Sequence, residues 1–314
     1  MAIMKILDYL CLKTKLPTMI TLTIILLNGL VVSKSILAKN KSPNVVESQF
    51  GSYLAGRQAQ FDNNPSSAIQ YYSSSLKQSP NNVFLIRRIV ALLVSYGKID
   101  EALPKAKQLL KLSNNTSNIA RLILVLDEIK NHQYIKAFKN TEKLREEGLN
   151  TYLIPILKAW ILAGQNKNDA ALKIIDRKTS APGLEILHGI QGAMISEFSG
   201  NVKDAITRYK KIAKLQKNIN LRTTILLGNL YERLGKKIKA KEIYDDYKNQ
   251  HPDTTVLVRA YKRLKIGEKP NPNNKIILDG IAEALFNLGI AVKNQDLYQA
   301  IIFSQLAVYL RPSF

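Results

Sequence analysis

Alanine recurs along this chain at a nearly constant interval, and that interval restricts the fold more than any other feature. The recurring residues are Ala68, Ala102, Ala137, Ala171, Ala205 and Ala240, which lie 34, 35, 34, 34 and 35 residues apart. One pair of helices with its turns has this length, and loops of unrelated length would not keep the step five times. The interval therefore predicts a chain of stacked helix pairs, with each alanine at a close approach between helices.

The clearest copy of the unit occupies residues 221–252 and reads as two amphipathic helices joined by a tight turn. The residues that define it are Leu227, Gly228, Tyr231, Ala240, Tyr244, Tyr247 and Pro252. This pattern resembles the tetratricopeptide repeat, with Trp-x-x-Leu-Gly-x-x-Tyr in the first helix and Ala-x-x-x-Phe-x-x-Ala before Pro in the second. Thr224 replaces the Trp, Tyr244 the Phe and Tyr247 the second Ala, so the match is partial.

The resemblance implies an all-α fold, namely a right-handed superhelical solenoid of antiparallel helix pairs, preceded here by an N-terminal hydrophobic helix. We expect a signal peptide or anchor over residues 1–38, a polar tether over 39–48 and six helix pairs over 49–252. An extra helix and a linker should follow over 253–274. One further pair is expected over 275–314, as part of an incomplete array.

The last pair departs from the period, because Ala300, the next alanine that fits the pattern, comes well over one interval after Ala240. Its second helix is strongly apolar, whereas the end of a solenoid usually carries a polar cap. We therefore expect something outside a single chain to cover that helix. A partner, a second copy that forms an oligomer through this helix, or the rest of a longer parent protein could each do so, and truncation is the most economical of the three.

The segment over residues 1–38 has the layout of a secretory signal peptide, which is basic, then apolar, then small. Three lysines precede an apolar run over residues 16–32, and Ala38 is the preferred cleavage site. This run is only just long enough to cross a bilayer, so an uncleaved membrane anchor is the alternative. The layout predicts export to the periplasm or cell envelope, or attachment to the inner membrane if residues 16–32 are retained.

Cysteine usage agrees with export. The single cysteine, Cys11, precedes the apolar run, so a cleaved chain would contain none. The exported chain would then lack disulfides, thiolate zinc sites and thiol chemistry.

The formal charge is +22, from 46 Lys and Arg against 24 Asp and Glu. Such an excess permits attraction to nucleic acid, anionic lipid or acidic glycan. Because Lys, Asn and Ile are abundant throughout, the base composition of the genome accounts for much of the bias, and nucleic acid is not favoured as a partner. A basic scaffold for an anionic polymer stays an alternative, which predicts steep salt dependence and one continuous Lys/Arg face.

Residue chemistry does not favour catalysis. His132, His188 and His251 lie in separate units without metal-ligand spacing, and no phosphate-binding loop or nucleophile elbow is present. We therefore expect no enzyme activity of its own, no metal and no cofactor. A regulatory subunit of an envelope enzyme is a further alternative.

The resemblance implies that the first helices line a concave groove for a peptide or helix of a partner protein. By register with residues 221–252, the groove candidates are Tyr53, Arg57, Arg87, Ala91, Leu122, Ile156, Trp160, Ile190, Met194, Arg222 and Asn229. Arginines there can hold carboxylates, and Trp160 can anchor an apolar side chain. Solvated arginines and a Trp160 packed in the core are the alternatives. The family's groove for terminal carboxylates uses Lys and Asn, which this chain lacks at those positions, so that function is not carried over.

Overall fold

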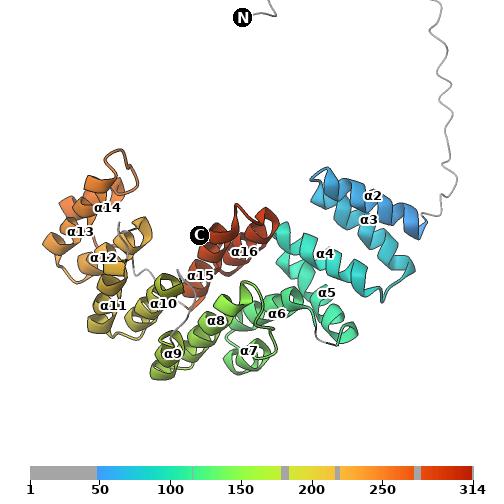
Figure 1. The fold of residues 1–314 in the computed structure, drawn as a ribbon, viewed down its shortest axis with the longest axis horizontal. Coiled ribbons are helices and arrows are strands. Elements are labelled where there is room, and N and C mark those ends of the chain that lie inside the picture. Colours follow the sequence, from blue (N-terminus) through green and yellow to red (C-terminus); the bar gives the residue numbers. More distant parts are fainter. Residues whose placement is uncertain (1–47, 115, 178–183, 216–219, 272–276, 313–314) are drawn as a thin grey trace, which may run out of the picture. The chain divides into compact units, whose positions relative to one another are not determined.

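The computed structural model describes residues 48–114, 116–177, 184–215, 220–271 and 277–312 (Figure 1). All regular structure in these ranges is α-helical, in fifteen helices. The predicted signal peptide or anchor, with its apolar run, lies outside the described residues, and so does nearly all of the polar tether. None of the described helices combines the length and the hydropathy that crossing a bilayer requires.

Six consecutive helix pairs come first in the chain. They are α2 (Gln49–Phe61) with α3 (Pro65–Gln78), α4 (Val83–Ser95) with α5 (Ile99–Leu112), α6 (Asn118–Lys130) with α7 (Tyr134–Thr141), α8 (Asn150–Gly164) with α9 (Asn168–Ile175), α10 (Leu184–Phe198) with α11 (Val202–Leu215), and α12 (Leu221–Arg233) with α13 (Lys237–Gln250). A short helix, α14 (Val258–Ile266), follows. The chain ends with the pair α15 (Ile277–Val292) and α16 (Leu297–Leu310).

The first six pairs stack in sequence order. Each first helix packs on its own second helix, and each second helix contacts the first helix of the next pair, ending with α13 against α14. The six periodic alanines are all fully buried. This arrangement confirms the expected all-α fold of stacked pairs, because each alanine lies at a helix contact that a larger side chain would hold apart.

Glycine in the first helix allows an aromatic side chain of the second helix to approach. A Cβ on Gly228 would lie 2.2 Å from the ring of Tyr244, and one on Gly56 would lie 2.8 Å from Tyr72. Both distances are shorter than any real contact, so these glycines are required by packing. The turn between α12 and α13 also favours glycine, since Gly235 has a positive φ of 72°.

A tyrosine in the second helix also ties one pair to the next. In α13, Tyr244 Oη donates to Glu232 Oε1 of α12 at 2.7 Å, and Arg263 Nη2 of α14 donates to the same oxygen at 2.9 Å. Glu232 is buried, and a buried carboxylate is stable only when it is paired and hydrogen-bonded. The same three roles are taken by Gln60, Tyr72 and Arg88 between the first and second pairs, and by Glu197, Tyr209 and Arg233 between the fifth and sixth.

The last pair does not extend the stack beyond α14. Instead α15 contacts α8 and α10, and α16 contacts α4 and α6, all of which are first helices (Figure 1). We call the surface of α2, α4, α6, α8, α10 and α12 that faces away from their second helices the inner face. The last pair therefore lies on the inner face.

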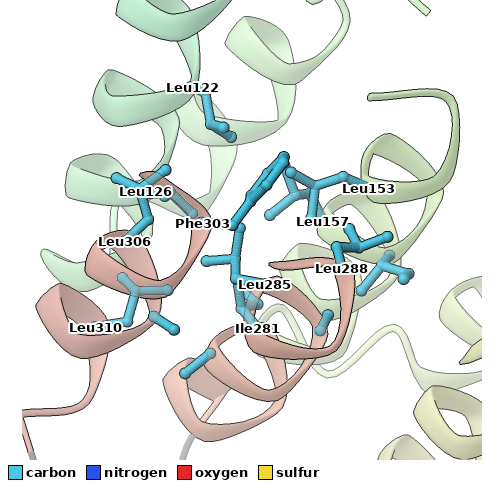
Figure 2. Packing of buried hydrophobic residues seen from close by; sticks show 14 of the residues in the cluster. Leu122, Leu126, Leu153, Leu157, Ile281, Leu285, Leu288, Phe303, Leu306 and Leu310 are labelled. Atoms are coloured by element: carbon cyan, nitrogen blue, oxygen red, sulfur yellow. The ribbon is translucent and has the colours of Figure 1, made fainter. Parts of the chain in front are cut away.

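Apolar side chains fill the contact between the last pair and the inner face (Figure 2). The residues that meet there are Leu122 and Leu126 of α6, Leu153 and Leu157 of α8, Ile281, Leu285 and Leu288 of α15, and Phe303, Leu306 and Leu310 of α16. Each of these is buried. Burial of one such side chain stabilises the fold by about 1.5–3 kcal/mol, so this contact is part of the core.

This placement corrects one expectation from the sequence. The apolar side of α16 is covered by helices of the same chain, so no partner, second copy or longer parent is needed to bury Phe303, Leu306 and Leu310. Leu297, Ile301 and Val308 on its other side stay exposed. Hydropathy predicted that α16 would be covered, but it carries no information about which surface would cover it.

Candidate functional site

The central section of the inner face, formed by α6, α8 and α10, is closed by the last pair. Trp160 of α8 is fully buried, and its Nε1 donates to Gln191 Oε1 of α10 at 2.7 Å. A Cβ on Gly280 of α15 would lie 2.0 Å from the Trp160 ring, so α15 rests directly on the indole. Met194 is also fully buried. Neither of these two groove candidates presents a surface to a partner in this structure.

Polar contacts fix the end of α16 on α6. Lys130 Nζ lies 3.7 Å from the centre of the Tyr309 ring and donates to the Tyr309 carbonyl at 3.2 Å. Tyr309 Oη donates to Asp127 Oδ1 at 3.1 Å. Burial, together with the neighbouring carboxylate of Asp127, raises the pKa of Tyr309, so this hydroxyl keeps its proton and its hydrogen bond at neutral pH.

The groove candidates on α12 form ion pairs and hydrogen bonds with side chains of the same chain. Arg222 Nη2 lies 2.5 Å from Glu283 Oε2 of α15, and Glu283 is buried. Asn229 Oδ1 accepts from Arg263 Nη2 at 2.9 Å and lies 3.0 Å from Tyr244 Oη. These two groove candidates therefore hold α15 and α14 in place.

The first helix, α2, differs because no described segment covers its inner face. Phe50, Leu54 and Phe61 are 77%, 63% and 82% exposed, and Arg57 is exposed between them. Steps of four, three and four residues place these side chains on one side of the helix. That side lies opposite the one that packs on α3. A soluble helix rarely exposes three large apolar side chains in one row.

The surface continues from α2 onto α4 through aromatic contacts. The Tyr53 ring lies 6.3 Å from the ring of Phe84, which is 50% exposed. Arg88 lies over Phe84, with its Cζ atom 4.7 Å from the ring centre, and donates to Gln60 Oε1 at 3.1 Å. Arg87 is exposed beside them. Phe84 is thus held in position while its outer face stays accessible.

The start of α16 borders this surface on the other side of α4. Tyr298 is hydrogen-bonded to Ser95 of α4 and lies near Arg88, and burial raises the pKa of its hydroxyl. Leu297 is exposed next to it. We call this whole surface the open section, defined by Phe50, Tyr53, Leu54, Arg57, Phe61, Phe84, Arg87, Arg88, Leu297 and Tyr298.

Positive charge dominates the open section. Arg57, Arg87 and Arg88 lie within α2 and α4, whereas neither of these helices nor α16 contains an Asp or Glu between its first and last residue. Two carboxylates at the ends of these helices are already hydrogen-bonded, since Asp62 accepts from Gln58 and Asp296 caps α16. The section therefore combines exposed aromatic rings with unopposed guanidinium groups, the residue types that contribute most to protein binding.

Of the eleven groove candidates, three are in the open section. They are Tyr53, Arg57 and Arg87. Sequence reasoning did not single out Phe50, Leu54, Phe61 and Phe84. A signal for the first three was present, because they form a second apolar row on a helix whose other side already carries the small residues that pack on α3.

The described residues offer little for metal or acid–base chemistry. No group of three or more His, Cys, Asp or Glu residues among them is arranged to hold a metal ion. His188 is buried, and that burial lowers its pKa. A cavity of about 470 Å³ beside it contains Arg208, but this guanidinium already binds Asp176 through two hydrogen bonds of 2.6 and 2.8 Å.

Comparison with protein-family models and with curated proteins finds no match. Solved structures of similar fold include PilW, described as a widely conserved type IV pilus biogenesis factor, with a TM-score of 0.50 and 15% identity over 68% of this chain and 98% of PilW. A tetratricopeptide repeat protein from Parabacteroides merdae has a TM-score of 0.55 and 12% identity over 83% of this chain and 99% of its own. At these identities the likeness shows the fold, which is tetratricopeptide-repeat-like.

Proposed function

We propose that the protein is a non-enzymatic interaction scaffold of the bacterial envelope, and that the open section binds its protein partner. One observation carries the proposal. The chain's own last pair covers the inner face over α6, α8 and α10, but leaves the row on α2 and the ring of Phe84 exposed. Part of the surface formed by the first helices, on α2 and α4, is therefore accessible to another molecule.

The chemistry of the open section supports binding of protein. Aromatic side chains and arginines are the residues most enriched at the energetic centres of interfaces, and exposed contiguous apolar surface commonly marks such sites. Contacts with Gln60 and Phe84 hold Arg88 in place before a partner arrives, so less side-chain entropy is lost on binding.

Photo-crosslinking in cells tests where the partner binds. A photoreactive phenylalanine analogue is placed at Phe61 or Phe84, and in control variants at Ile135 of α7 or Ile238 of α13, which are 83% and 77% exposed on second helices. We expect a defined adduct from the first two positions and none from the controls. Adducts of equal yield from all four positions, or from the controls alone, would contradict the proposal.

The envelope part rests on the layout of the segment over residues 1–38. A fusion of residues 1–60 to a reporter that is active only outside the cytoplasm should be active, and an inactive reporter would refute export. Extraction at alkaline pH then separates the two forms. A cleaved chain is released from membranes, whereas a chain anchored through residues 16–32 stays with them.

The exposed lysines of α11 and α13 support the alternative function, in which the protein is a basic scaffold that binds an anionic polymer. These residues are Lys203, Lys210, Lys211, Lys214, Lys237, Lys239, Lys241 and Lys248. If they bind an anionic polymer, the affinity should fall steeply and linearly on a log–log plot against salt. A partner held by the open section should depend less on salt, because apolar burial is not screened.

A further inference from the structure

The proposed function leaves the chemistry of the partner open, and the open section narrows it. Resting on that function, we infer that the partner segment is an acidic amphipathic helix. Its apolar side would lie on the exposed rings, and its carboxylates would face Arg57 and Arg87.

The helical form follows from what already lies on the same face. Over α4 and α6 the inner face is covered by α16, an apolar helix that inserts Phe303, Leu306 and Leu310. Steps of three and four residues between these anchors are those of a helix that presents one side to a groove. The exposed surface of α2 and α4 continues the surface that α16 covers. We therefore expect the partner segment to lie on α2 and α4 as a helix, in the way that α16 lies on α4 and α6.

The size of the exposed row sets the length of that helix. Phe50 and Phe61 are eleven residues apart in α2, or about 17 Å at about 1.5 Å per residue. A partner helix of about three to four turns would cover the row. Its apolar residues should recur at three- and four-residue steps to meet the Phe50, Leu54 and Phe61 side chains.

Charge distinguishes this partner from α16 itself. No charged residue lies between Leu297 and Leu310, and the surface under the middle of α16 is apolar. The open section instead carries Arg57 and Arg87, both exposed, without a carboxylate in α2 or α4. Arginine holds carboxylates through two parallel hydrogen bonds, so Asp or Glu on the rim of the partner helix is the matching chemistry.

Three synthetic probes test the inference on the full chain. All are labelled peptides of roughly fourteen residues, about four turns. The first has Leu at helical spacing and Glu elsewhere, the second replaces each Glu by Lys, and the third keeps the first composition but scatters the Leu around the helix. Fluorescence anisotropy should show the first binding at least about tenfold more tightly than the other two. Equal binding of the Lys peptide overturns the acidic part, and equal binding of the scattered peptide overturns the amphipathic helix.

Charge reversal then assigns the site. Arg57→Glu with Arg87→Glu should weaken the acidic probe about tenfold or more, whereas the matched control Arg177→Glu with Arg259→Glu, both exposed elsewhere, should change it by less than about twofold. Unchanged circular dichroism confirms that both double variants fold. An unchanged affinity in the first variant overturns the inference. Adducts at Phe61 and Phe84 without binding of the acidic probe would leave the scaffold standing and remove only the acidic helix.

Discussion

The α2 and α4 part of the open section and the central section both belong to the inner face, but the first is exposed and the second is buried beneath the last pair. Leu122 of α6, in the central section, is 4% exposed beneath the last pair, whereas Phe84 of α4, in the open section, is 50% exposed, with Arg88 over its ring and Tyr53 beside it. Both are large apolar side chains on one continuous surface. The difference shows that apolar character in a repeat array does not distinguish buried core from exposed surface, and that contact with a distant segment decides between them.

The hydrogen bonds that join one pair to the next also differ between the two ends of the array. The Tyr72 hydroxyl in the first pair meets the neutral Gln60, whereas those of Tyr209 and Tyr244 meet the carboxylates of Glu197 and Glu232. The pairs beyond α9 are thus joined by buried ion pairs, while the pair that carries the open section uses a neutral amide. Stability and acid sensitivity should therefore differ between the two ends.

Removal of the last pair should have the largest effect. A chain that stops after Asn271 exposes Leu122, Leu126 and Leu153 to water, together with the ring of Trp160. We expect loss of cooperative unfolding and aggregation, because several buried side chains each lose about 1.5–3 kcal/mol. Size-exclusion chromatography and thermal unfolding measure this. A truncated chain that stays monomeric with the same melting temperature would show that the central section needs no cover.

Matched Phe→Ala substitutions compare the two sections directly. Phe303→Ala should lower the free energy of unfolding by about 3–5 kcal/mol, because it leaves a cavity in a packed contact. Phe84→Ala should cost about 1 kcal/mol or less, since half of that side chain is already in water. Urea unfolding of both variants measures the difference. Similar costs at the two positions would mean that the open section is core after all.

Two Gly→Ala substitutions compare how closely α15 packs on α8 with how closely α2 packs on α3. The new Cβ at Gly280 would lie 2.0 Å from the ring of Trp160, so Gly280→Ala should destabilise the fold by about 1–3 kcal/mol. At Gly56 the nearest ring atom of Tyr72 is 2.8 Å away. Alanine gains about 1 kcal/mol of helix propensity at both positions, so the longer contact distance at Gly56 makes the expected loss there the smaller one. A larger loss at Gly56 than at Gly280 in thermal unfolding would reverse the expected order of the two contacts.

The smallest of the four expected effects is on the pH dependence of stability, which should depend on Asp204 of α11. Burial tends to raise the pKa of Asp204, but hydrogen bonds from Ser196 and Arg208 outweigh it and lower the pKa below its ordinary value. A lowered folded-state pKa stabilises the fold above about pH 4, and this stabilisation is lost as pH falls through the folded-state value. Asp204→Asn should remove that part of the acid dependence, about 0.5 kcal/mol or less after solvent screening.

Urea unfolding of this variant between about pH 6 and pH 3 measures the slope. Asp62→Asn in the first pair is the matched control for the loss of one carboxylate, since Asp62 is exposed at the end of α2. Equal slopes for the Asp204→Asn variant and the unmodified chain would remove the assigned role of Asp204.

Local sequence predicted the repeating unit well. The period of the alanines, the Gly228 beside Tyr244 and the turn at Gly235 depend on residues less than about 35 positions apart, within one pair. Prediction of which first-helix residues stay accessible was less complete. Register with residues 221–252 selected Tyr53, Arg57 and Arg87, which lie in the open section, but it also selected Trp160 and Met194, and both are buried.

The sequence by itself determined that helices would pair, that pairs would stack in order, and that the last helix would need a cover. Only the tertiary structure decided that, among the described helices, α15 and α16 fold back onto α4, α6, α8 and α10 and do not cover α2. The physical reason is that helix periodicity is encoded in neighbouring residues, whereas the hydrophobic effect is non-directional. An apolar side of a helix gains the same free energy on any apolar surface that it can reach, and the path of the chain determines which surface that is.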